Sequence, residues 1–439
     1  MEAAIKALVA ANEHREIVAQ TAAAAHLAAL IRNDKSAADA LELLAIPALL
    51  NCLRKGSGEP RASAALGLAR LQSIDPEAPQ EVFEARGEPT AVAALLEEVR
   101  GGTPKGRGNA CMALYELMRG HDPAPAAVAA GGGAAAFVGV IGDVEDGKGA
   151  EESKGGDSGG ATAEARAEAL QALRFLHRSV PSVLDAMLEA NAPAAYVALA
   201  RDGTPRGRAD ACAALVTIME ASPRASRMAA KAGAASVLDA ALRGLDKAAR
   251  GTVAMAVARL VEGVPDEANK LFDAGTHEPL IAVLTDGVAG GRASHPGDAA
   301  LALARMQAGS PLVSMTLVEL KTHEALLRVL KEDKLPLSKQ RAAFALSFFG
   351  ELEEHVARWA VRDGAVPALL AHLDDKRAST RHECASSVER LLLVAPRETT
   401  AAVTAAGGRA KFERAMRDPD AGVVAAVRSV LASLKPEGA

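Results

Sequence analysis

The apolar positions of this 439-residue chain recur with a helical spacing along almost its whole length. The pattern A-x-x-A-L-x-x-L places its apolar residues at offsets of four and three, which is one stripe of an α-helix. Successive copies are 42 to 46 residues apart, apart from one step of 59. The first small-residue column reads Ala64, Ala110, Ala169, Ala211, Val253, Ala299, Ala342, Cys384 and Val427. The pattern therefore predicts a series of long helices at a period of about 42 residues.

Two shorter helices are expected between successive long ones. A proline recurs in these intervals, at positions 123, 181, 223, 265, 311 and 396, and proline suits the first turn of a helix. Some ten residues later comes a turn marked by glycine, as in "KAGAAS" (231–236), and then a short apolar stretch. A unit of this size cannot bury its own apolar face, so neighbouring units must stack into one continuous core.

Three helices per unit, this period and the glycine before "AVPALL" (365–370) resemble armadillo repeats. The HEAT repeat, a related helical repeat, is the close alternative. The resemblance implies an all-α, right-handed superhelical solenoid of about nine to ten three-helix repeats. Residues 1–32 are interpreted as a partial N-terminal capping repeat, with its long helix in "HREIVAQTAAAAHLAALI", and residues 33–439 as the armadillo-like array.

The one long step contains an acidic, Gly/Ser-rich insertion at 143–160. It has no apolar periodicity, so we expect a disordered, exposed loop. Within it, "GDSGG" (156–160) matches the string around the nucleophile of chymotrypsin-like serine proteases, and His26 lies in an upstream "TAAAAHL". Serine catalysis needs a rigid oxyanion hole and a base within hydrogen-bonding distance. A disordered loop several repeats from His26 provides neither, so we do not interpret the chain as a protease.

Composition narrows the class of protein further. The net charge is −5 and there is no block of Lys and Arg, so nucleic acid is not an expected partner. The apolar runs are too short for a membrane span, and the amino terminus lacks the features of a signal peptide. The four cysteines are far apart and form no CxxC pair, which is typical of a reducing compartment. We therefore expect a cytoplasmic protein, with the nucleus as the other compartment, and no cofactor.

Three His-Glu pairs suggest an alternative function. They start at His277, His323 and His382, and "RHECASS" (381–387) is similar to the motif with which deoxyhypusine hydroxylase, a helical-repeat enzyme, holds two irons. The alternative is thus a helical-repeat metal-dependent hydroxylase. However, the first two pairs fall at the start of a second helix and the third falls inside a long helix, so symmetric convergence on a metal is not expected. We interpret these histidines as surface or turn residues, and expect no metal site and no enzyme.

Because repeats occupy the whole chain, function is expected on their surface. The armadillo resemblance implies that the long helices line a concave groove. In peptide-binding members an Asn just before the last apolar column clamps the partner's main chain, with a Trp one turn earlier. Neither residue type occurs at these positions here, so recognition of basic peptides is not expected. The groove column instead reads Arg70, Glu116, Phe175, Thr217, Arg259, Arg305, Phe348, Arg390 and Ser433.

This column predicts a non-enzymatic scaffold or adaptor that binds a segment of a partner protein. Arg259 and Arg305 lie in adjacent repeats, and guanidinium groups bind carboxylates and phosphates in bidentate fashion. With Phe348 as an apolar anchor, they predict an acidic or phosphorylated segment. The alternative is that each arginine pairs with an acid of the chain itself, such as Glu262 or Glu389. The column identifies neither the partner nor the oligomeric state.

Overall fold

The structure, a computed structural model, describes residues 1–14, 16–143, 161–290, 295–350 and 354–434. Throughout these ranges the regular elements are helical, with 29 α-helices, one 3-10 turn (η1, Pro181–Val183) and no strand. The all-α class predicted from the sequence is therefore confirmed. The predicted loop, apart from Asp143, lies outside the described residues, as does the whole "GDSGG" string.

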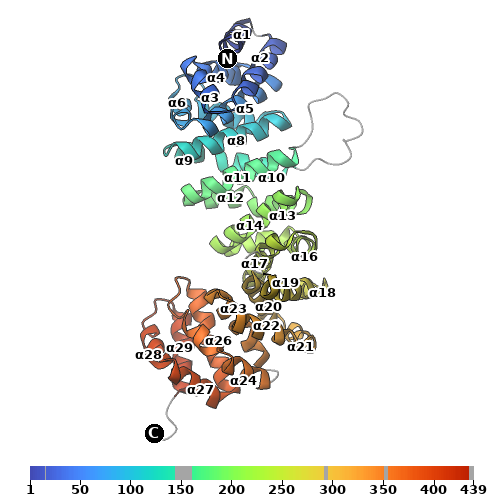
Figure 1. Ribbon diagram of the computed structural model, residues 1–439, viewed down its shortest axis with the longest axis vertical. Helices are drawn as coiled ribbons and strands as arrows, with labels where there is room; N and C mark the ends of the chain where they lie inside the picture. The colour runs from blue at the N-terminus through green and yellow to red at the C-terminus, as the bar shows by residue number, and fades with distance from the viewer. Residues whose placement is uncertain (15, 144–160, 291–294, 351–353, 435–439) are drawn as a thin grey trace. The chain divides into compact units, whose positions relative to one another are not determined.

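Two helices, α1 (Glu2–His14) and α2 (Ile17–Leu30), pack against each other and precede the three-helix repeats (Figure 1). The nine first helices of the described repeats are short: α3 (Asp34–Glu42), α6 (Ala78–Glu84), α9 (Ala124–Ala130), α12 (Leu184–Glu189), α15 (Pro223–Lys231), α18 (Glu267–Asp273), α21 (Pro311–Glu319), α24 (Glu354–Arg362) and α27 (Pro396–Ala405). The predicted boundary after residue 32 falls between α2 and α3 and stays a prediction.

Each first helix is followed by a second helix and then by a third helix, which is the longer of the two except in the repeat of α19 and α20, where both have 14 residues. The second helices are α4 (Ala45–Lys55), α7 (Ala91–Gly101), α10 (Gly133–Gly142), α13 (Ala192–Asp202), α16 (Ala234–Gly244), α19 (His277–Gly290), α22 (Thr322–Glu332), α25 (Ala365–Leu370) and α28 (Gly408–Ala415). The third helices are α5 (Glu59–Ile74), α8 (Pro104–Gly120), α11 (Ala163–Ser179), α14 (Pro205–Ala221), α17 (Lys247–Gly263), α20 (Pro296–Gly309), α23 (Pro336–Gly350), α26 (Ala378–Val394) and α29 (Ala421–Ser433).

The third helices form the centre of the core. Every residue of the predicted small-residue column is fully buried on them, because α5, α8 and α11, and likewise α17, α20, α23 and α26, pack side by side (Figure 1). Small side chains at these contacts let neighbouring helices approach closely. The following apolar column is buried as well, except for Leu431. Leu431, on α29, is half-buried.

The turn between a first and a second helix has a left-handed backbone residue. Gly233 and Gly364 have φ of 82° and 100° at this turn, a region that glycine enters without a steric cost. The glycine-marked turn is therefore as predicted. Three repeats place another residue there, and Leu44, Asn191 and Lys321 adopt φ of 60°, 63° and 52°.

By its internal contacts the chain divides into two compact units, Met1–Ile218 (unit 1) and Met219–Ala439 (unit 2). Each unit contains several complete repeats and is described by itself below. In the part of the chain that the structure describes, no single helix is both long and apolar enough to cross a membrane, although two bent pairs of adjacent helices meet that criterion jointly.

Candidate functional site

The predicted groove residues of unit 1 lie on four successive third helices. Arg70 on α5 donates a hydrogen bond to the carbonyl oxygen of Ala28. Glu116 on α8 forms an ion pair with Arg119, with 3.0 Å between Oε2 and Nη2, and burial raises the pKa of Glu116. Arg70 and Glu116 are therefore each engaged by a group of the chain itself.

The other two, Phe175 on α11 and Thr217 on α14, line a common pocket of about 510 Å³. Tyr115 on α8 contributes a second ring, which meets the Phe175 ring edge-on with 5.6 Å between the centroids. The pocket thus has an aromatic wall, and it lies wholly within unit 1.

Arginines surround this pocket. Arg174, Arg178 and Arg206 line it together with a single acid, Asp210. The carboxylate of Asp210 lies 3.4 Å from Nη1 of Arg174 and 3.9 Å from Nε of Arg206, while the Arg178 guanidinium lies 5.1 Å from the centroid of the Phe175 ring. Three positive charges against one negative charge leave the pocket with an excess of two positive charges, which favours an anionic ligand.

His177 also lines the pocket. Burial lowers the pKa of its imidazole, so this side chain is neutral at pH 7 and adds no charge to the arginines.

Phe175 and Thr217 were predicted from the sequence, whereas the three arginines were not. The predicted groove column takes one residue per third helix, whereas the pocket is also lined by residues in neighbouring turns of α11 and α14. Part of the signal was present in the sequence, because Arg178 stands three residues after Phe175 and four after Arg174, the spacings at which side chains on a helix are neighbours.

In unit 2, the predicted pair Arg259 and Arg305 does lie close together, but both bind acids of the chain. Arg259 on α17 contacts Oε1 of Glu220 at 3.1 Å through Nη2 and Oε2 of Glu262 at 2.6 Å through Nη1. Arg305 on α20 contacts the other oxygen of Glu262 at 3.0 Å, and it also binds Glu383 on α26. Only 8% of the Arg259 side chain is exposed. The pairing with Glu262 is the alternative that the sequence analysis left open for these arginines.

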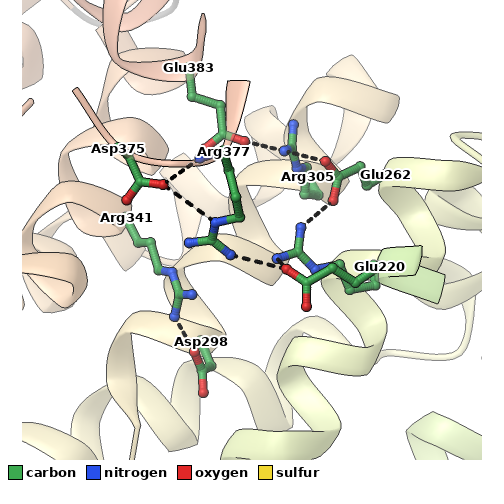
Figure 2. Close-up of polar contacts among 9 residues, drawn as sticks. Glu220, Glu262, Asp298, Arg305, Arg341, Asp375, Arg377 and Glu383 are labelled. Atoms are coloured by element: carbon green, nitrogen blue, oxygen red, sulfur yellow. Dashed lines mark hydrogen bonds and ion pairs between the residues drawn. The ribbon is translucent and has the colours of Figure 1, made fainter. Parts of the chain in front are cut away.

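Two further arginines extend this cluster. Arg341 on α23 binds Asp298 on α20. Arg377, just before α26, lies 3.3 Å from Glu220 through Nη1 and 3.6 Å from Asp375 through Nε. Figure 2 shows these side chains converging from several helices of unit 2. We call the nine residues the unit 2 ionic cluster: Arg259, Arg305, Arg341, Arg377, Glu220, Glu262, Asp298, Asp375 and Glu383.

The remaining groove residues of the sequence analysis, Phe348 and Arg390, contact each other. The Arg390 guanidinium lies 4.2 Å from the centroid of the Phe348 ring, and its Nη1 lies 3.4 Å from Oγ of Ser347. Phe348 is buried. It is therefore covered by Arg390 instead of presenting an open apolar anchor.

The three His-Glu pairs are placed separately by the fold. His277 begins α19 and His382 lies within α26, as expected. His323, in contrast, is neither a surface nor an exposed turn residue, because it is buried on α22 beside Phe349 and Trp359, with ring centroids 6.0 and 6.2 Å away. Within the described ranges no group of three or more His, Cys, Asp or Glu side chains is arranged to hold a metal ion.

The cysteines also have a packing role. Cys52, Cys111, Cys212 and Cys384 are all buried free thiols. Burial raises the pKa of the Cys52 and Cys212 thiols to about 12. These thiols are protonated at pH 7, and protonated thiols are poor nucleophiles.

Comparisons with known proteins agree with the fold. No model of a known protein family matches the chain. A stretch of 90 residues is 36% identical to U-box domain-containing protein 4 of Oryza sativa subsp. japonica, and it covers 20% of this chain and 12% of the rice protein. The chain therefore matches only a small part of that relative.

Two solved structures of engineered proteins are also similar. The crystal structure of one engineered protein aligns with 99% of this chain and 98% of its own, at 21% identity and a TM-score of 0.64. A designed armadillo repeat protein aligns with 55% of this chain and 99% of its own, at 20% identity and a TM-score of 0.40. The first of these supports the fold alone.

Each repeat has three helices, as in armadillo repeats, whereas HEAT repeats have two. The fold is therefore that of an armadillo-like repeat protein, as the sequence resemblance predicted.

Proposed function

We propose that this chain is a protein-interaction scaffold that binds an acidic or phosphorylated segment of a partner protein on the faces of its third helices. The principal site is the pocket between α11 and α14. The observation that supports it is the combination, in one open pocket, of three aromatic side chains (Tyr115, Phe175 and Tyr196) with three arginines and a single aspartate.

The chemistry of the pocket suits such a segment. Each guanidinium group has five N–H donors in a planar fork, and carboxylates and phosphates accept two of them at once. Asp210 contacts Arg174 and Arg206 at 3.4 and 3.9 Å, so it uses few of the donors around the pocket. Arginine and tyrosine are also the residue types that contribute most to binding energy at protein interfaces.

The proposal assigns no catalytic role to the chain. Repeat folds of this type present extended concave surfaces that are used for recognition.

Peptide binding to the full chain tests this function. Fluorescence anisotropy would compare three fluorescein-labelled peptides of equal length, one rich in glutamate, one phosphorylated and one rich in lysine. We expect the two anionic peptides to bind and their affinity to fall as salt is added. Arg174→Glu with Arg178→Glu should weaken anionic binding by about tenfold or more, because charge-assisted hydrogen bonds are lost.

A matched control has the same change of charge elsewhere in unit 1. Arg86→Glu with Arg201→Glu alters two exposed arginines outside the pocket and should leave binding nearly unchanged. Circular dichroism would establish that both variants are folded. Equal loss in the two variants, or unchanged binding by the pocket variant, would contradict the proposed site.

A further inference from the structure

Unit 2 contains contacts between repeats that are not neighbours in the array. In an array of stacked repeats, each repeat normally contacts only its immediate neighbours. Arg377, in the link before α26, nevertheless binds Glu220 at the end of α14, 157 positions earlier in the chain. Arg305 on α20 binds Glu383 on α26, 78 positions away and two repeats further on. The face formed by α17 and α20 is therefore crossed by side chains from α26 and the link before it (Figure 2).

The acids of the unit 2 ionic cluster lie where an anionic ligand of its arginines would lie. Glu262 bridges Arg259 and Arg305 through its two oxygens, and Glu383 adds a second carboxylate on Arg305. In all, four arginines meet five carboxylates in the cluster. The arginines predicted from the sequence are thus already neutralised by the chain itself.

We infer that the third-helix face of unit 2 is an anion-binding face held closed by the chain's own carboxylates. We call the contacts of Arg377 with Glu220 and of Arg305 with Glu383 the latch. Opening the latch exposes Arg259 and Arg305 to an acidic segment of a partner protein. The nature of the occupant rests on the proposed function. The latch itself is independent of the proposed function, because it follows from the contacts between distant repeats.

The outermost contact is expected to open first. The side chains of Arg377 and Glu220 are 36% and 45% exposed, whereas those of Arg305 and Glu383 are 16% and 9% exposed. Salt screens exposed pairs much more than buried ones. Raised ionic strength, or a competing polyanion, should therefore separate Arg377 from Glu220 before it affects the buried contacts.

Distance measurements on the full chain test the latch. Spin labels would be attached at Ala221→Cys and Lys376→Cys, two exposed positions that adjoin Glu220 and Arg377. The four native cysteines are buried, so labelling is selective. Double electron–electron resonance should give a short, narrow distance distribution at low salt. Adding Arg377→Ala, or raising the salt to about 1 M, where charges are screened within a few ångströms, should make it longer and broader.

Arg362→Ala is the matched control for this measurement. Arg362 is an exposed arginine on α24 that pairs with the adjacent Asp363, outside the cluster. It should leave the distance distribution unchanged. A distribution that responds neither to Arg377→Ala nor to salt would show that no latch exists.

A gain of binding tests the anion-binding face separately from the unit 1 pocket. In the Arg174→Glu, Arg178→Glu background, Glu220→Gln with Glu383→Gln should increase affinity for the glutamate-rich peptide by about tenfold. Adding Arg305→Glu should abolish that gain. The control, Glu278→Gln with Glu324→Gln, removes the same charge from exposed positions of unit 2 outside the cluster and should give no gain.

The two proposals fail in different ways. If Glu220→Gln with Glu383→Gln gives no gain, or the same gain as the control, the anion-binding face of unit 2 is wrong. The effect of Arg174→Glu with Arg178→Glu alone still decides the unit 1 pocket.

Discussion

Lys321 has the left-handed backbone conformation that most other repeats assign to glycine at the same turn. Its φ is 52°, and the residue is exposed just before α22. A residue with a Cβ atom pays roughly 1 to 2 kcal/mol for this conformation. Gly233 and Gly364 avoid that cost at the corresponding turns. The packing of the repeat therefore imposes this turn conformation, although lysine at position 321 disfavours it.

Lys321→Gly should accordingly stabilise the chain. We expect the free energy of unfolding to rise by about 1 kcal/mol, less than the full strain because glycine also gains freedom in the unfolded chain. Chemical denaturation monitored by circular dichroism would measure it. Lys321→Ala keeps the Cβ atom and should show no such gain. A glycine variant no more stable than the alanine variant would mean that the turn is unstrained.

At the scale of helices, the buried columns could be predicted from the sequence but the contacts between charged groups could not. Burial of Ala211 or Val253 follows from a spacing that each repeat encodes by itself. The contact of Arg305 with Glu383 depends on how several repeats curve within unit 2. No periodic pattern contains that information. Arg174 and Arg178 were missed for a simpler reason, because the column admitted one residue per helix.

The pair of Asp298 on α20 and Arg341 on α23 illustrates the cost of a buried charge. Burial raises the pKa of Asp298 and lowers the pKa of Arg341, and in both groups this exceeds the opposite effect of the partner's charge. For a carboxyl group whose pKa is higher in the folded state, the contribution to stability is present below the unfolded pKa and is lost as pH rises through the folded pKa.

Asp298→Asn should remove this pH dependence. The variant loses the ion pair at every pH, so the informative quantity is the difference in unfolding free energy between it and the unmodified chain. As pH rises from about 4 to about 7, we expect the unmodified chain to lose stability relative to the variant. The loss should be about 1.4 kcal/mol for each pH unit by which the pKa of Asp298 in the folded chain exceeds its pKa in the unfolded chain. Denaturation at three pH values would measure it. Asp266→Asn, at an exposed position, serves as control, and a shift in the opposite direction would contradict the assigned cause.

At the scale of the whole molecule, one repeat pattern supports two differently charged surfaces. The unit 1 pocket, between α11 and α14, is lined by three arginines and by a single carboxylate, that of Asp210. The corresponding face of unit 2 is neutralised by the carboxylates of its ionic cluster. The fold was predictable because the repeat determines it. The difference between the two faces was not, because it arises from side chains outside the repeated apolar columns.

Site-resolved cross-linking tests the central claim, that an acidic segment binds the third helices of unit 1, most directly. The full chain would be irradiated with a glutamate-rich peptide that contains a benzophenone group, and the modified residues would be located by mass spectrometry. We expect the cross-links to concentrate in α11 and in residues 205–218 of α14, and to disappear with Arg174→Glu and Arg178→Glu. Cross-links concentrated on first helices such as α9, or equal labelling by a lysine-rich peptide, would contradict the claim.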